Sequence, residues 1–232
     1  MCWVCLVFGG ILVSIGDIGL RDGKDAVNYL GNTHGGLVQI GEQWYIFYHR
    51  QTNRTQFSRQ CCAEPVQILP DGSIPQAEVT SCGLNGGPLP GRGSYPARIA
   101  CNLSSAHGVC SYTKSEEIGS EHPFFTQSGG DREGVGDQYI ANLQNGAWAG
   151  FKYFAFTGEE KTVSVTVHGD AYGTLYVATE RGGGTLAAEI PVTPSSEWTK
   201  FSAPLSVKPG MAPLYFTWHG SGAADFTAFD IE

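Results

Sequence analysis

Short runs of β-favouring residues, separated by turn residues, recur about every 8 to 14 residues from residue 138 to the C-terminus. In residues 162–169, three valines alternate with Thr, Ser and His, so one face of the strand is apolar and the other polar. Such a series predicts a β-sandwich or jelly roll. We expect strands at 138–143, 148–156, 162–169, 173–180, 185–192, 197–205, 212–220 and 224–232.

The composition of the chain favours the same fold class throughout. Of the 232 residues 32 are Gly, 12% are aromatic and only 16% are charged. Tight turns use glycine, and long exposed helices need many charges, so we expect an all-β protein.

Charge and cysteine divide the chain into two regions. Residues 1–110 hold seven basic and seven acidic side chains, so the net charge of −8 lies entirely in residues 111–232. All seven cysteines lie in residues 1–110. We therefore predict two domains, 1–110 and 111–232.

The cysteines form neither a regular disulfide framework nor a zinc ribbon. Their number is odd, Cys61 and Cys62 are adjacent, and the single C-x-x-C motif has no second half. We expect most of them to be reduced and buried. Cys101 and Cys110 would close a short loop in an oxidising compartment.

The remaining sequence excludes some partners. The surface is acidic and no basic stripe is interleaved with aromatics, which argues against nucleic acid and anionic membranes. Residues 1–15 are apolar but lack a basic n-region and are too short to span a bilayer, so a core strand pair is favoured over a signal peptide. The localisation stays open.

Two hairpins are predicted in the first region. "LVQI" and "WYIFYH" are joined by Gly41-Glu42, which suits a two-residue turn. "EPVQIL" (64–69) and "QAEVT" (76–80) flank a turn at Pro70–Ser73. Four such strands make about one propeller blade, and one blade cannot bury both of its faces.

Residues 9–83 resemble the last blade of glycoside hydrolase family 43, five-bladed propeller enzymes that act on xylosides and arabinosides. The motif "NTHGG", the strand "WYIFYHR", a downstream arginine and the turn "DGSI" carry the resemblance. It implies that His34 lies near the propeller axis, beside a metal ion or water, and that Arg59 lies near the sugar pocket.

The same resemblance implies that the catalytic carboxylates lie on the first three blades, which this sequence does not contain. Asp17, Asp22 and Asp25 are better explained as turn and loop residues, and Glu64 and Glu78 are expected to be exposed. We therefore assign no catalytic residue.

Residues 121–232 resemble family 6 carbohydrate-binding modules in strand order and turn spacing. By this resemblance Trp148 and Trp198 enclose one sugar, and Asp225 takes the place of an asparagine that completes the cleft. A carboxylate accepts hydrogen bonds but donates none, so the ligand preference would differ. Trp218 lies in a regular strand and is assigned to the core.

The family's structural calcium is a possible cofactor by the same resemblance. In the final strand, the position where the family usually has an acidic residue is occupied here by Thr227. This leaves four acidic side chains as candidate oxygen donors: Glu121, Asp131, Glu133 and Asp230.

Three functions remain open. The first is binding of xylan-like polysaccharide or oligosaccharide by the second region, attached to an incomplete propeller. The second is glycoside hydrolysis of the β-xylosidase or α-L-arabinofuranosidase type, completed by self-association or a partner chain. The third is a scaffold that binds no ligand. An unfinished propeller edge also predicts self-association.

Overall fold

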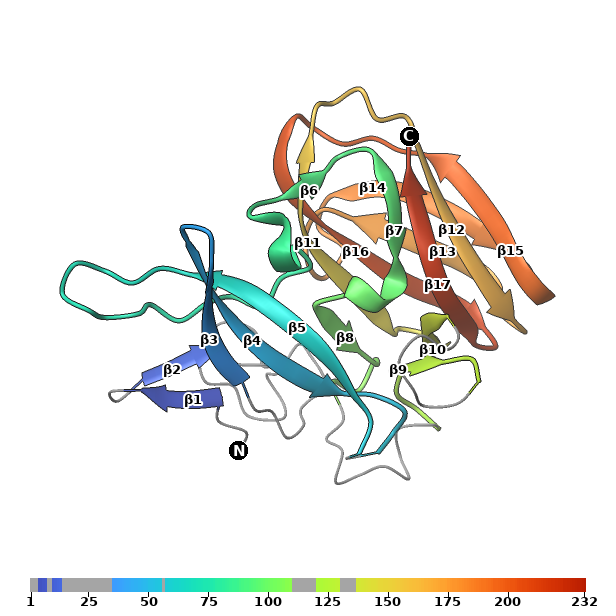
Figure 1. The fold of residues 1–232 in the computed structure, drawn as a ribbon. Coiled ribbons are helices and arrows are strands. Elements are labelled where there is room, and N and C mark those ends of the chain that lie inside the picture. Colours follow the sequence, from blue (N-terminus) through green and yellow to red (C-terminus); the bar gives the residue numbers. More distant parts are fainter. Residues whose placement is uncertain (1–3, 8–9, 14–34, 56, 110–119, 130–136) are drawn as a thin grey trace.

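The computed structural model describes residues 4–7, 10–13, 35–55, 57–109, 120–129 and 137–232. Nearly all of its regular structure is β, as predicted. Figure 1 shows a three-stranded sheet on one side of the molecule and two layers of strands, which form the sandwich, on the other. The described residues contain no helix long and apolar enough to cross a membrane.

One layer of the sandwich has the strand order β15-β12-β17-β10-β9, and β7 also pairs with β17. We call this layer the outer-site sheet, because its outer face carries the candidate site described below. Its strands are β7 (Gly93–Pro96), β9 (Phe124–Gln127), β10 (Gln138–Leu143), β12 (Thr162–Gly169), β15 (Ser195–Pro204) and β17 (Ala224–Ile231).

The second layer has the order β14-β13-β16-β11-β6, and β8 also pairs with β11. Its strands are β6 (Leu89–Pro90), β8 (Asn102–Ser104), β11 (Trp148–Phe156), β13 (Tyr172–Ala178), β14 (Leu186–Val192) and β16 (Gly210–Ser221). All eight strands predicted from residue 138 onward are present in the two layers.

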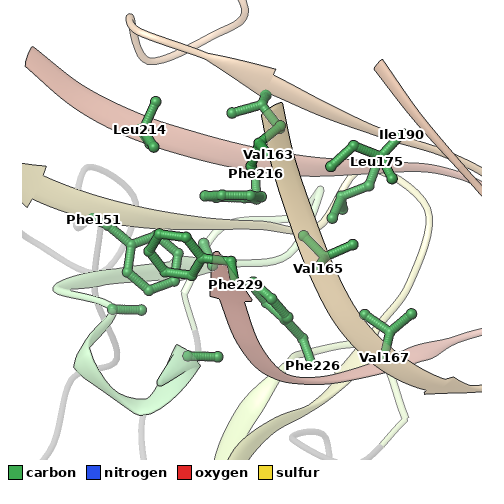
Figure 2. Packing of buried hydrophobic residues seen from close by; sticks show 14 of the residues in the cluster. Phe151, Val163, Val165, Val167, Leu175, Ile190, Leu214, Phe216, Phe226 and Phe229 are labelled. Carbon is green, nitrogen blue, oxygen red and sulfur yellow. The ribbon is translucent and has the colours of Figure 1, made fainter. Parts of the chain in front are cut away.

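The core between the layers follows the predicted alternation. Val163, Val165 and Val167 are buried, and Figure 2 shows them in one cluster with phenylalanines of both layers. Trp218 is fully buried, which confirms its assignment to the core. The ring centroids of Phe151 and Phe229 lie 4.7 Å apart in an edge-on arrangement that aromatic pairs favour.

The segment before residue 110 takes part in the sandwich. Strands β6 and β8 extend the second layer, and β7 pairs with residues 228–231 of β17. Two short strands, β7 and β8, are separated by a 3-10 turn at Ala97–Ile99. Pro96 removes a ladder donor at that break. The domain boundary at residue 111 stays a prediction. Three strands that precede it in the chain, β6, β7 and β8, pair with strands of the sandwich.

The propeller-like region contains two separate small sheets. The hairpin β1 (Val4–Val7) and β2 (Gly10–Val13) confirms the predicted N-terminal strand pair. The other sheet, the blade sheet, has the order β3 (Gly35–Ile40), β4 (Gln43–Gln51) and β5 (Arg59–Val66). The β3–β4 turn is the predicted one: Gly41 has a φ of 63°, which favours glycine.

Residues 76–80 do not form the expected fourth strand. The segment crosses one face of the blade sheet instead, and Ala77 and Val79 join its core with Ile46 and Val66. The backbone N–H of Thr80 donates to the Glu64 side chain rather than to a neighbouring strand. A 3-10 turn at Gly83–Asn85 follows.

Hydrogen bonds and an ion pair join the blade sheet to the sandwich. Arg50 of β4 is buried; its guanidinium donates to the carbonyls of Arg98, at 2.6 Å, and Ala100, and lies over the Phe125 ring. Lys152 Nζ lies 2.7 Å from Glu78 Oε1. The two regions therefore share a built interface, which includes the C-terminal part of β4.

Candidate functional site

An exposed aromatic group lies on the outer-site sheet. Four neighbouring strands each contribute one side chain: Trp198 from β15, His168 from β12, Asp225 from β17 and Tyr139 from β10. Their neighbours Val167, Ile140 and Phe226 are buried in the core, so the period-two alternation of a strand turns the four side chains outward. We call these four residues the aromatic face.

The rings of the aromatic face contact one another. Trp198 is 39% exposed, and its ring centroid lies 4.1 Å from that of His168 and 5.3 Å from that of Tyr139. The Trp198 and Tyr139 rings are nearly perpendicular, at 71°. The indole is thus held by neighbours on two sides while part of its surface stays in contact with solvent.

Asp225 supplies the charged group of the aromatic face. Its Oδ1 accepts a hydrogen bond from the Asn142 backbone N–H at 2.8 Å, and its Oδ2 lies 3.7 Å from His168 Nε2. Burial raises the pKa of the Asp225 carboxyl above its ordinary value, although the Asn142 hydrogen bond and His168 oppose this. Asn142 has a positive φ of 64° at a bulge in β10, which aims its N–H at the carboxylate.

Trp148 lies elsewhere. It begins β11 in the second layer, is half-buried, and packs edge-on against Tyr215 with ring centroids 5.8 Å apart. The expected enclosure of one sugar by Trp148 and Trp198 is therefore not built: the two belong to different sheets, and Tyr139 is the aromatic partner of Trp198. The role of both tryptophans in binding stays a prediction.

Sequence reasoning missed Tyr139 and His168. Both lie within predicted strands, and the alternation around buried Ile140 and Val167 indicates that they point outward. The pairing of β12 with β17 sets His168 directly opposite Asp225. This register joins residues far apart in the chain, so it cannot be predicted from the sequence pattern alone.

The candidates in the propeller-like region have different outcomes. His34 lies outside the described residues. Arg59 is exposed at the start of β5, opposite Gln51. The expectation that Glu64 and Glu78 are exposed was wrong: Glu64 is 1% exposed and Glu78 is half-buried, because both accept hydrogen bonds at the contact with the sandwich or the 76–80 segment.

Most cysteines in the described residues are less buried than expected. Cys61 is exposed, Cys62 and Cys82 are intermediate, and only Cys101 is buried. Cys110, the possible partner of Cys101, lies outside the described residues.

The calcium candidates do not converge in the part of the chain that the structure describes. Asp230 accepts a hydrogen bond from Ser94 and pairs with Lys200 Nζ at 2.7 Å, and Glu121 is exposed. Asp131 and Glu133 lie outside the described residues. No group of three or more His, Cys, Asp or Glu side chains among the described residues is placed to hold a metal ion. Calcium stays a prediction.

Comparison with known proteins gives a relative in sequence. The chain is 46% identical over 231 residues to a "Xylosidase/arabinosidase" of Thermoclostridium stercorarium. The match covers 97% of this chain and 48% of the relative, so the chain spans about half of the relative's length. No protein-family model matches the chain.

Solved structures share the fold. A family 43 arabinoxylan arabinofuranohydrolase from Bacillus subtilis, solved with cellotetraose, matches 87% of this chain and 41% of its own at a TM-score of 0.57 and 17% identity. A β-1,3-glucan-binding family 6 module from Bacillus halodurans matches 63% of this chain and 99% of its own at a TM-score of 0.49 and 17% identity.

The fold is therefore all-β, with a propeller-like part joined to a sandwich. The chain is a homologue of part of a xylosidase/arabinosidase, which confirms the resemblance to a family 43 glycoside hydrolase drawn from its own residues.

Proposed function

We propose that this chain binds plant polysaccharide of the xylan or arabinoxylan kind through the aromatic face. The observation that carries the proposal is the environment of Trp198, which is 39% exposed yet packed against His168 and Tyr139. The names of the relatives, which include arabinose- and xylose-releasing enzymes, support the ligand class.

The chemistry of the aromatic face fits a neutral sugar chain. An indole face stacks on the apolar C–H face of a pyranose ring, and the neighbouring rings restrict its rotation, which lowers the entropy lost on binding. The Asp225 carboxylate accepts hydrogen bonds from sugar hydroxyls and donates none. The face therefore selects ligands that donate at this position.

Affinity electrophoresis in gels that contain arabinoxylan tests this role. We expect the wild-type protein to be retarded and Trp198→Ala to run as in a gel without polysaccharide. Tyr172→Ala is the matched control, because Tyr172 is an aromatic side chain, 64% exposed, in β13 of the other layer. Unchanged retardation of a folded Trp198→Ala protein would remove the assignment.

Glycoside hydrolysis, completed by self-association or a partner chain, is the second candidate, and the sequence relationship to a xylosidase/arabinosidase favours it. Hydrolysis by the usual mechanism needs two carboxyl groups on either side of the scissile bond. A cavity of about 260 Å³ lies beside strands β4 and β5, and among the described residues that line it Glu64 is the one with a carboxyl group. Turnover of nitrophenyl xyloside or arabinofuranoside by repurified protein would establish this candidate instead.

A further inference from the structure

A cavity of about 260 Å³ lies between the blade sheet and the segment that leads to the sandwich. One wall comes from β4 and β5, and the opposite wall comes from residues 79–84 and 98–99. Three lining residues, Cys61, Leu84 and Arg98, are exposed, so the cavity meets solvent on their side. It is separate from the aromatic face, whose residues do not line it.

The inner end of the cavity carries a buried carboxyl group. Glu64 is 1% exposed; its Oε1 accepts hydrogen bonds from Thr80 N and Tyr48 Oη, at 2.8 and 3.1 Å, and its Oε2 accepts one from Thr80 Oγ1 at 2.6 Å. A carboxylate offers about four acceptor positions, so one position on Oε2 remains for a donor.

The remaining lining is amphipathic. Val79, Ile99 and Cys62 give apolar wall area, and the lining also includes Arg98, an exposed and cationic residue. The Arg98 carbonyl accepts hydrogen bonds from the Arg50 guanidinium at 2.6 Å and from the Gln60 amide at 3.0 Å. These two bonds fix the position of the Arg98 backbone.

These features define a ligand by size and chemistry. The volume lies just below the range of about 300–1,000 Å³ for sites of drug-sized molecules, and it suits a single sugar ring. Apolar walls pack on the C–H faces of such a ring, an inner carboxylate accepts from a hydroxyl, and the guanidinium donates to hydroxyl or carboxylate oxygens.

We propose that this cavity between the blade sheet and residues 79–99 is a second binding site, which takes one monosaccharide-sized polyhydroxylated molecule. Neutral pentoses and sugar acids share this chemistry. Binding of a pentose engages mainly the Glu64 end, and a sugar acid gains in addition from the Arg98 guanidinium.

The test uses the full chain with Trp198→Ala, so that the aromatic face does not contribute. D-xylose, L-arabinose and D-glucuronate are titrated by calorimetry, with saturation-transfer NMR as a second readout. We expect saturable binding of at least one of the three, with a dissociation constant on the order of 1–10 mM, as befits a small ligand. No saturable binding of any of them would overturn the proposal.

Two further variants locate the site. Cys62→Phe fills the cavity and Leu84→Trp covers its mouth, and each is expected to weaken binding at least tenfold. Because Leu84 is 55% exposed, Leu84→Trp tolerates the larger ring without loss of the fold. Leu186→Trp is the matched control on the sandwich, at 46% exposed. Equal affinities in Leu84→Trp and Leu186→Trp would place the ligand elsewhere and overturn the proposal.

The test of the cavity is independent of the test of the function proposed above. Loss of arabinoxylan retention in Trp198→Ala tests the aromatic face alone, whereas monosaccharide titration of the same variant tests the cavity alone. Arg98→Ala separates the two ligand sources: selective loss of glucuronate binding supports a sugar acid, and unchanged xylose binding supports a neutral pentose.

Discussion

Glu64 is a buried residue whose ionisation affects the stability of the fold. Burial raises its pKa from 4.5 to about 7, against the opposing hydrogen bonds from Thr80 and Tyr48. The folded state therefore binds a proton more tightly than the unfolded state between these values. The contribution of Glu64 to stability is fully present below pH 4.5, falls as the pH rises toward 7, and is constant above it, with a total loss of ~3 kcal/mol.

Glu64→Gln should remove this dependence. The amide keeps an acceptor for Thr80 N and Tyr48 Oη, and its NH₂ group donates to Thr80 Oγ1. Thermal unfolding from pH 5 to 8 should show a falling melting temperature for wild type and a flat one for Glu64→Gln. Glu42→Gln, at an exposed turn position, is the control and should retain the slope. A slope that persists in Glu64→Gln would assign it to another group.

Asp225 is the residue that sets ligand preference on the aromatic face. Asp225→Asn keeps an acceptor for the Asn142 N–H but replaces a charged acceptor by a neutral amide, which makes a weaker hydrogen bond with a sugar hydroxyl. We expect arabinoxylan affinity to fall about fivefold, or ~1 kcal/mol. Calorimetry with a soluble xylo-oligosaccharide measures it, and tighter binding by Asp225→Asn would show that the ligand accepts at this position.

At the scale of elements, strand β4 joins the two regions through Arg50. Its guanidinium donates to Gln60 as well as to the carbonyls of Arg98 and Ala100, and it covers the Phe125 ring. Arg50→Met removes the Arg50 donor to the Ala100 carbonyl and one of the two donors to the Arg98 carbonyl, which should lower the free energy of unfolding by about 2–4 kcal/mol. Urea unfolding measures the change.

Arg54→Met is the matched control for that experiment. Arg54 also lies over a phenylalanine of β9, with its guanidinium carbon 4.9 Å from the Phe124 centroid, but it is exposed. We expect it to cost less than about 1 kcal/mol. Equal losses in the two variants would mean that the Arg50 hydrogen bonds contribute little to the interface.

The elements also show which features the sequence predicts. Strands β10 to β17 could be predicted because apolar and polar residues alternate along them, which indicates one buried face, as at Val163 and Val165. Strands β6, β7 and β8 are only two to four residues long, and β6 and β7 contain a proline, so their residue pattern is too short to predict a strand. Spacing along the chain does not say which sheet a strand joins, so the sequence did not show that Trp148 and Trp198 belong to different layers.

At the scale of the whole molecule, the blade sheet leaves an apolar surface exposed on β3 and after β5. Val38, Ile40, Ile68 and Leu69 are all between 38% and 47% exposed. Within the described residues β3 pairs on one side only, with β4. An exposed strand edge with apolar side chains favours pairing with another chain, so the self-association predicted from the sequence has a defined surface.

Charge on this edge should prevent the association. Both Val38 and Ile40 are exposed, so Val38→Lys/Ile40→Lys places two ammonium groups in solvent without disturbing the core, and lysine is a residue that protects natural edge strands. Light scattering over a dilution series should show concentration-dependent oligomers for wild type and monomers for the double variant. Met211→Lys, on the sandwich and 64% exposed, is the control and should associate like wild type. A wild-type protein that is monomeric at every concentration would contradict the prediction, because the β3 edge would then not be a contact surface.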